Sequence, residues 1–459
     1  LQDIVRNGID KKAILAGINY MEFRYREADF GQFPKGLMYG LDIMGSWLYD
    51  DENAFSQVQL LSIYDRLKEA VNEGYFEKLI QKWLLDNTHG LILTLVPKRG
   101  LAAQREKELA DKLEAYRSSL SDGQLEEMVE KTKALEAYQE SEERPEDLQC
   151  IPMLKRSDIR KEVNGFSNEE LQVDNSLFLY QDVCTNGIGY VNVMFEIKDM
   201  AVEKVHYLGL LKSVLGYVDT ENYTYGQLFN ETNARTGGIQ CGVDVFDKAD
   251  DPEAFRAMFT IRGKALYPQM DFLFQMMEEI LNTSKITDTK RLYEIIAEIK
   301  SRGQVSLIGS GHQTAVLRGA SYGSPMARFQ DEMAGVGYYK FIEDLEKNFQ
   351  DKKAEIVAGL ENAMAEIIRR DSFMVSYTGE RESVEQLKAL SGSLKKSLKE
   401  SSCQVPEVAI TCEKKNEGFK TSGQVQYVAR TGNFVKKGFT YTGALEILKV
   451  ALSLSLIHI

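Results

Sequence analysis

The sequence has little proline, histidine and cysteine for its length. It contains 8 Pro and 35 Gly in 459 residues, with 43% hydrophobic and 27% charged residues, which excludes a collagen-like, low-complexity or wholly disordered chain. The five cysteines stand singly, without a Cys-x-x-Cys pair, which excludes a zinc ribbon or a dithiol redox motif. Scattered cysteines are typical of a reducing compartment. We predict a cytoplasmic protein, with an organellar matrix as the alternative in a eukaryote. The cysteines are Cys150, Cys184, Cys241, Cys403 and Cys412.

The sequence also lacks a long apolar run and an excess of positive charge. Its clearest apolar run, residues 91–96, is far shorter than the roughly 20 residues that span a bilayer, so we predict no membrane segment. The chain opens on Leu1 without a basic region followed by an apolar stretch, so we expect no signal peptide and interpret the chain as a fragment. With 56 basic and 69 acidic residues, the net charge of −13 argues against a nucleic-acid partner.

The four histidines are too far apart to form a helical zinc motif. None of His89, His206, His312 and His458 lies within five residues of another, so no helix can present a pair at positions i and i+4. Because a catalytic zinc needs three protein ligands, we predict no metal site made by this chain alone. We interpret the first three as hydrogen-bonded surface or cap residues, with His312 in a Gly-Ser-Gly-His loop.

One Gly-x-Ser-x-Gly pattern occurs, at residues 319–323 around Ser321. A nucleophile elbow needs a buried strand before the serine and a histidine well after it. Only three apolar residues precede it, and the sole later histidine is His458. We therefore favour a Gly-rich turn, with a nucleophilic serine as the alternative.

The first 97 residues have a helical pattern followed by one apolar run. Residues 10–83 have apolar side chains at spacings of three and four, such as Ile14, Ile18 and Met21. The run 91–96 is closed by Pro97, which favours a buried strand. This part resembles the end of an α+β domain.

Residues 98–147 differ in kind, with 9 basic and 14 acidic side chains. Leucines and tyrosines at helical spacing predict a helical hairpin. Ser121 would cap the second helix, with Gln124 at the capping-box position, and Pro145 would end it. The alternative is a solvated charged linker.

Residues 151–400 predict one complete domain of strands and helices. We expect strands at 176–182 and 188–198, joined as a hairpin through Asn186-Gly187, because this pair tolerates the positive φ of a tight turn. Further strands are expected at 239–245, 255–261 and 373–377, with helices between them. This order predicts an α+β fold with helices on a mainly antiparallel sheet. A second domain begins after residue 401, with a strand at 424–430 and a helix at 443–452.

A polar helix end precedes Gly237-Gly238, and it supplies the candidate site residues Asn230, Asn233 and Thr236. These side chains would face a cleft and contact substrate. The alternative is helix capping alone, because helix C-termini are often polar for that reason.

Several stretches in order resemble the presequence-protease branch of the insulinase (pitrilysin-type) zinc metallopeptidases, and they cover nearly the whole chain. The stretches are His89-Gly90-Leu91 to Pro97, Ile151-Pro152-Met153-Leu154, Ser157-Asp158-Ile159, Tyr225-Gly226-Gln227-Leu228-Phe229-Asn230, Thr236-Gly237-Gly238-Ile239, Ala320-Ser321-Tyr322, Gly337-Tyr338-Tyr339, Tyr427-Val428-Ala429 and Tyr441-Thr442-Gly443-Ala444-Leu445.

The resemblance implies a clamshell of two homologous halves, each of two α+β domains, that closes round a peptide chamber. The family's zinc motif, His-x-x-Glu-His, and its distant Glu would lie upstream of Leu1, so we expect no catalytic or metal residue here. The corresponding stretch of the third domain, 207–212, has neither His nor Glu. The implied parts are the end of the second domain (1–97), the hairpin (98–147), a non-catalytic third domain (151–400) and the start of the fourth (401–453). The tail, residues 454–459, departs from the family pattern. We interpret this tail as an artefact, in which His458 has no function.

The function implied is that of part of a zinc metalloendopeptidase that degrades unstructured peptides in an enclosed chamber. This chain would supply chamber wall and a substrate-gripping surface lined by the candidate asparagines and threonine. Its partners would be peptides and the N-terminal half of the same polypeptide, and it would be inactive alone. The alternative is a non-catalytic peptide-binding or scaffold homologue of the same fold.

Overall fold

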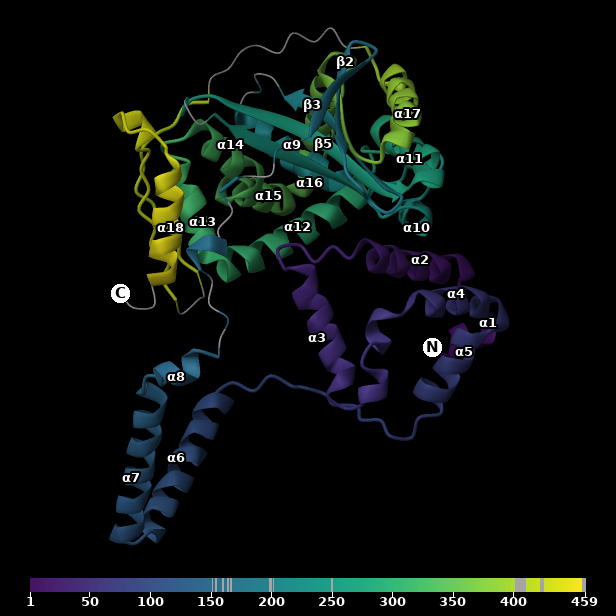
Figure 1. Ribbon diagram of the computed structural model, residues 1–459. Helices are drawn as coiled ribbons and strands as arrows, with labels where there is room; N and C mark the ends of the chain where they lie inside the picture. The colour runs from purple at the N-terminus through teal and green to yellow at the C-terminus, as the bar shows by residue number, and fades with distance from the viewer. Residues whose placement is uncertain are drawn as a thin grey trace. The chain divides into compact units, whose positions relative to one another are not determined.

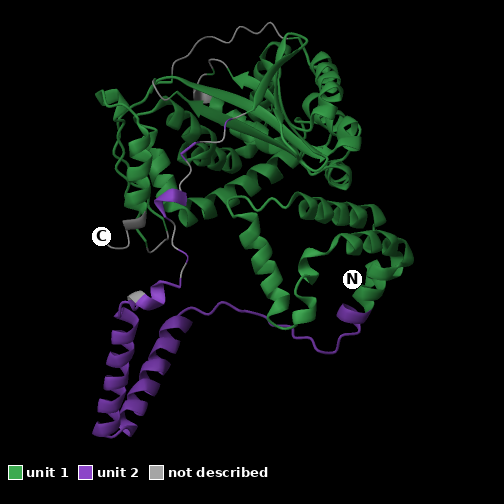
Figure 2. Ribbon diagram, in the orientation of Figure 1, with its two compact units in different colours: residues 1–81, 166–459 green, residues 82–165 purple. Residues whose placement is uncertain are grey.

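The structure is a computed structural model of the chain, and it describes all residues except 151, 153–154, 159–160, 163–164, 166, 198–199, 201, 249–250, 401–409, 422–424 and 456–459. Cys403, His458, the start of the strand expected at residue 424 and the end of the predicted tail lie outside the described residues. The chain divides into two compact units, residues 1–81 with 166–459 and residues 82–165 (Figure 2). The domain boundaries given above stay a prediction.

The larger unit is built round one sheet. Within the described residues, six strands pair in the order β1-β2-β6-β3-β5-β4, and all neighbours are antiparallel except β2 and β6. Figure 1 labels β2, β3 and β5 of this sheet among the helices of the same unit. The predicted α+β fold on a mainly antiparallel sheet is therefore confirmed. The strands are β1 (Asn168–Val173), β2 (Ser176–Asp182), β3 (Ile188–Ile197), β4 (Ile239–Asp247), β5 (Phe255–Leu266) and β6 (Phe373–Gly379).

The predicted hairpin between β2 and β3 is wrong, because β6 lies between these strands. Asn186 and Gly187 do have positive φ angles, of 55° and 80°, but the pair fixes only a local bend of the chain. The tight hairpin joins β1 and β2 instead, through Asp174 and Asn175 at φ 47° and 61°. The Asn-Gly pair thus predicted the positive φ angles of the turn, but it did not predict which strands pair with each other.

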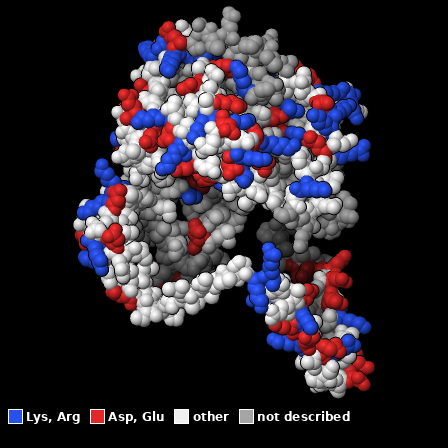
Figure 3. All heavy atoms as spheres, turned by 180° about the vertical axis from the view of Figure 1, so that it is seen from behind, with Lys and Arg blue, Asp and Glu red and all other residues white. Residues whose placement is uncertain are grey.

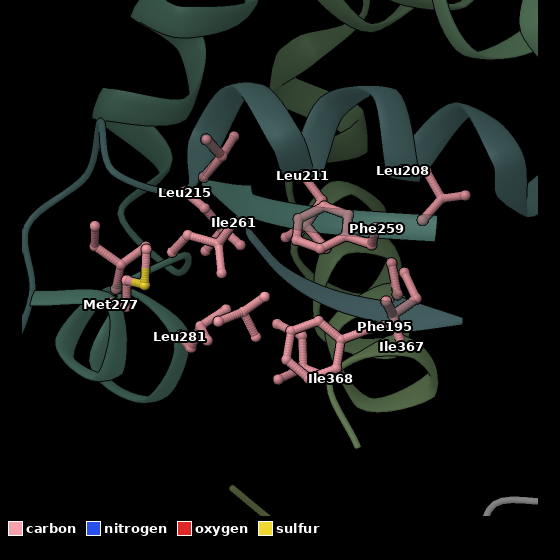
Figure 4. Close-up of a cluster of buried hydrophobic side chains, with 14 of the residues drawn as sticks. Phe195, Leu208, Leu211, Leu215, Phe259, Ile261, Met277, Leu281, Ile367 and Ile368 are labelled. Carbon is pink, nitrogen blue, oxygen red and sulfur yellow. The ribbon is translucent and has the colours of Figure 1, made fainter. Parts of the chain in front are cut away.

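Helices cover the apolar side of the sheet and close the core. The odd-numbered residues of β3 from Val191 to Phe195 are buried, as the alternation predicted, and Met194 between them is buried as well. Figure 4 shows Phe195 and Phe259 of the sheet beneath Leu208 and Leu211 of α9. The helices of this unit are α1 (Gln2–Asn7), α2 (Lys11–Glu27), α3 (Lys35–Trp47), α4 (Leu61–Ala70), α5 (Tyr75–Ile80), α9 (Val202–Val214), α10 (Tyr225–Arg235), α11 (Met270–Thr283), α12 (Thr289–Gly309), α13 (Gly311–Ala320), α14 (Pro325–Ala334), α15 (Val336–Lys347), α16 (Phe349–Ile367), α17 (Val384–Ser397) and α18 (Gly443–Ser455).

The smaller unit contains the predicted helical hairpin, α6 (Leu101–Ser119) and α7 (Asp122–Glu140), followed by α8 (Pro145–Leu148). The Ser121 hydroxyl accepts a hydrogen bond from the Gln124 backbone N–H at 3.4 Å, and the Gln124 side chain accepts one from Ser121 N–H at 3.0 Å. The two predicted helices and the capping box are therefore present, while no residue of either helix is buried, so both helices are solvated as the charged-linker alternative expects. The role given to Pro145 is wrong, because α7 ends at Glu140 and the proline begins α8. Figure 3 shows acidic and basic side chains intermixed on the visible face of the chain.

Two predicted strands are wrong. Residues 91–96 have no secondary structure, and Ile92 is 96% exposed. Residues 425–430 likewise form no strand, although the helix predicted after them is present as α18. A strand needs a partner for its backbone groups, and no described strand pairs with either run. Among the residues that the structure covers, no helix combines the length and the apolar character that crossing a bilayer requires.

A charged cluster fastens the chain beyond α17 to the helical layer. Arg318 of α13 donates to Asp331 of α14 at 2.6 Å and to Glu417 at 2.8 Å. The Tyr322 hydroxyl also donates to Glu417. Hydrogen bonds from Arg318 and Tyr322 to the carboxylate lower the pKa of Glu417 to about 2.

We expect Glu417 to make the stability of the chain depend on acid pH. Its folded pKa lies below its usual 4.5, so its contribution is complete above pH 4.5 and is lost as the pH falls toward 2. The free energy of unfolding, from urea titrations followed by circular dichroism at pH 5, 4 and 3, should fall less steeply in Glu417→Gln than in the parent. The control Glu413→Gln, with a 74% exposed side chain, should follow the parent. Parallel curves for Glu417→Gln and the parent would contradict the expectation.

Candidate functional site

The candidate site lies where α10 ends and β4 begins. α10 starts at a capping box, in which Thr224 Oγ1 accepts from Gln227 N–H at 3.3 Å and the Gln227 side chain accepts from Thr224 N–H at 3.0 Å. At its other end, the Thr236 hydroxyl donates to the Thr232 carbonyl at 2.7 Å and accepts from Gly238 N–H at 3.0 Å. The chain then turns through Gly238, at φ 101°, into β4. Both ends of α10 are therefore fixed by local hydrogen bonds.

A pocket of about 90 Å³ lies at this junction, and only one of the three sequence-predicted residues lines it. Asn233 lines it, Asn230 of the same helix does not, and Thr236 is buried in the cap. Asn233 Nδ2 donates to the Phe229 carbonyl at 2.9 Å. Their role in lining a chamber stays a prediction. The lining residues are Leu215, Gly216, Tyr217, Leu228, Phe229, Thr232, Asn233, Gly238, Ile239, Gln240, Cys241 and Ile280.

One wall of the pocket, the turn after α9, was missed by the sequence analysis. Gly216, at φ 86°, ends the helix in a left-handed turn, and Tyr217 N–H donates to the Val214 carbonyl at 2.9 Å. Tyr217 is thereby placed at the rim, 55% exposed. The glycine after the last periodic apolar residue was the available signal, but it indicates only a helix end.

The loop that follows this turn is held by a buried carboxylate. Glu279 of α11 accepts hydrogen bonds from the Asn222 backbone N–H and side-chain Nδ2, both at 2.9 Å. Burial alone would raise the pKa of Glu279, but the hydrogen bonds from Thr220 and Asn222 outweigh it and hold the pKa below its usual value. The loop carrying the pocket wall is therefore anchored to α11.

The opposite side of the junction is fixed by α2. A side chain at Gly237 would collide with the Phe23 ring and with Lys264, so the glycine permits this close packing. Asn19 Nδ2 donates to the Ala234 carbonyl at 2.9 Å. Lys264 Nζ lies 2.6 Å from the Glu27 carboxylate. Helix α2 thus braces the end of α10 and the sheet beside it.

β4 forms an edge of the sheet. It pairs with β5 from Ile239 to Asp247, and no other strand among the described residues pairs with it. The backbone groups on its outer side therefore have no strand partner among the described residues. Cys241 lies in this strand and in the pocket, and burial raises the pKa of its thiol to about 12, so the thiol stays protonated and unreactive at neutral pH.

The other residues tested as catalytic candidates have structural roles. His206 Nε2 lies 2.7 Å from Glu332 Oε2, and its ring stacks on Phe341, which confirms a hydrogen-bonded histidine. The loop expected around His312 is wrong, because α13 already begins at Gly311. Ser321 is fully buried in a turn, and its hydroxyl donates to the Arg318 carbonyl at 2.7 Å, so the turn interpretation is confirmed.

No group of three His, Cys, Asp or Glu side chains that could hold a metal occurs in the described part of the chain. The stretch 207–212 is part of α9, where Leu208, Leu210 and Leu211 are fully buried and a side chain at Gly209 would collide with the Met333 carbonyl. The described residues of this chain therefore do not fit a zinc site.

The chain belongs to the peptidase M16-C associated family, whose model matches residues 95–345, more than half of its length. This confirms the resemblance to the presequence-protease branch of the insulinase metallopeptidases.

The chain is 35% identical to protein HypA of Clostridium perfringens, over 98% of this chain and 46% of that protein. It is 26% identical to presequence protease 1, chloroplastic/mitochondrial, of Arabidopsis thaliana, over 99% of this chain and 42% of that protein. The chain therefore spans less than half the length of these two relatives. Among solved structures it is similar to a peptidase M16 inactive domain from Pseudomonas fluorescens, with a TM-score of 0.36 and 10% identity over 52% of this chain and 53% of that one.

Proposed function

We propose that this chain is the non-catalytic half of a zinc metalloendopeptidase that degrades unstructured peptides in an enclosed chamber. Its similarity to a presequence protease along 99% of its length carries the proposal. In this proposal the zinc, which activates a water for attack on the peptide carbonyl, is bound by the N-terminal half of the same polypeptide. This chain supplies chamber wall and a surface that holds the peptide, and we propose the cytoplasm as its location.

Two features of the larger unit support peptide holding. The outer edge of β4 offers backbone hydrogen-bonding groups to an extended chain. The junction beside it is braced by α2 and by the loop bound to Glu279, so its shape is present before a peptide arrives. An extended peptide has all its backbone groups free for such an edge, whereas most strands of a folded protein are already paired. Enclosure and edge pairing together would select unstructured substrates.

We expect the 459-residue chain alone to bind no stoichiometric zinc and to cleave no peptide. The longer protein, with the upstream segment restored from the source DNA, should bind one zinc and cleave an unstructured peptide at least 100-fold faster than its Glu→Gln variant in the His-x-x-Glu-His motif. Zinc is measured by elemental analysis and cleavage by mass spectrometry. A disulfide-linked mini-protein of similar length serves as the folded control and should remain intact.

Cleavage by the 459-residue chain that a chelator abolishes would contradict the division of labour proposed here. A degenerate upstream motif, combined with peptide binding without cleavage, would replace the peptidase by the non-catalytic peptide-binding homologue.

A further inference from the structure

We propose that the pocket between α10 and β4 takes an aliphatic side chain of a peptide that pairs as an added strand with the outer edge of β4. This inference rests on the proposed function and specifies the class of peptide that this chain holds. The two observations behind it are independent: the edge is a property of the sheet order, and the pocket is a property of side-chain packing.

The lining of the pocket favours an aliphatic group over a charged one. None of the residues that line it is acidic or basic, and Leu228, Ile239 and Ile280 supply apolar surface. The Cys241 thiol is protonated, so it also adds no charge. A carboxylate or ammonium group would lose its hydration there without gaining an ionic partner.

The size of the pocket limits the side chain further. A volume of about 90 Å³ is smaller than the roughly 150 Å³ of an engineered protein cavity that binds benzene. A valine or leucine side chain therefore matches this volume better than the indole of tryptophan. The rings of Tyr217 and Phe229, 55% and 62% exposed, stand at the rim, where they can cover the rest of the bound residue.

The position of the pocket matches a peptide paired with β4. Its wall includes the first three residues of the strand, from Ile239 to Cys241, so the pocket borders the segment with which the peptide would pair. Side chains alternate between the two faces of a strand, so one residue of the added strand can enter the pocket while its neighbours point to the other face.

The inference is tested with the 459-residue chain and fluorescein-labelled ten-residue peptides of Ala, Ser and Thr. The central residue is Leu, Asp, Lys or Trp, and affinity is measured by fluorescence polarisation. We expect the Leu peptide to bind at least tenfold more tightly than each of the other three. Equal affinities for Leu and Asp would overturn the aliphatic pocket.

A matched pair of variants tests the location. Asn233→Phe fills the pocket from α10 and should weaken binding of the Leu peptide at least tenfold. Asn230→Phe places the same ring on the same helix outside the pocket and should change binding less than twofold. Equal effects of the two variants, or none, would overturn the assignment of the site.

Backbone methylation tests the strand pairing without altering the protein. Two versions of the Leu peptide carry N-methyl groups at alternate residues, one at odd and one at even positions. Only one set of N–H groups can face β4, so one version should lose binding and the other keep it. Similar binding of both would refute strand addition. If the longer protein cleaves peptides at the same rate with Asn233→Phe, this inference fails while the proposed function stands; if it cleaves none, the proposed function fails whatever the binding shows.

Discussion

Replacing Asp331 by alanine is expected to lower the free energy of unfolding by about 3–5 kcal/mol, the usual cost of removing one partner of a buried ion pair. The Asp331 side chain is fully buried and lies 2.6 Å from Arg318. Its two oxygens also accept hydrogen bonds from the backbone N–H groups of Val336, at 3.1 Å, and Gly337, at 3.2 Å. The variant leaves both N–H groups and part of the guanidinium without their acceptor, and water cannot easily replace it.

Urea titrations followed by circular dichroism at pH 7 measure this loss. The matched control is Asp351→Ala, which removes an exposed carboxylate from the first turn of α16 and should change the free energy by less than about 0.5 kcal/mol. A loss below about 1 kcal/mol for Asp331→Ala would show that the cluster does not fasten α14 to α13 and α15.

The helices of this fold were predictable because their signals are local. The capping box at Ser121 and Gln124 lies within four residues, and it forms as the pattern predicts. The end of α10 at Gly237-Gly238 is equally local. Each of these features depends on a few neighbouring residues, so the sequence alone indicates them.

Strand pairing was not predictable in the same way. β6 lies between β2 and β3 in the sheet, although it follows them by nearly 200 residues in the chain. The local pattern at Asn186-Gly187 gives no indication of this third strand. The run 91–96 shows the converse, since its composition favours burial, but a strand exists only where a partner strand is present.

The candidate site was partly predictable for the same reason. Asn233 could be proposed from its place near the end of a polar helix. The other walls of the pocket come from the turn at Gly216, from Ile280 of α11 and from β4, which are brought together only by the tertiary fold. A pocket assembled from three separate segments has no signature in any one of them.

Three phenylalanines lie side by side on neighbouring strands in the middle of the sheet, and removing the central ring should strongly lower the free energy of unfolding. Phe195 of β3 stands opposite Phe373 of β6 on one side and Phe259 of β5 on the other. It is fully buried, and its ring lies 5.9 Å from that of Phe373 in an edge-to-face arrangement. Phe195→Ala should therefore lower the free energy of unfolding by about 3–5 kcal/mol, through lost burial and the cavity left between two aromatic neighbours.

The control for this variant is Phe246→Ala on β4, where the ring is 54% exposed. Both changes remove the same side chain from the same sheet, so the difference between their free energies of unfolding isolates the effect of burial. We expect the control to cost less than about 1 kcal/mol, because most of its ring is already in water. Similar losses for both variants would mean that β3 does not hold the centre of the core. The sheet order would then be in doubt, and with it the open edge of β4 on which peptide binding depends.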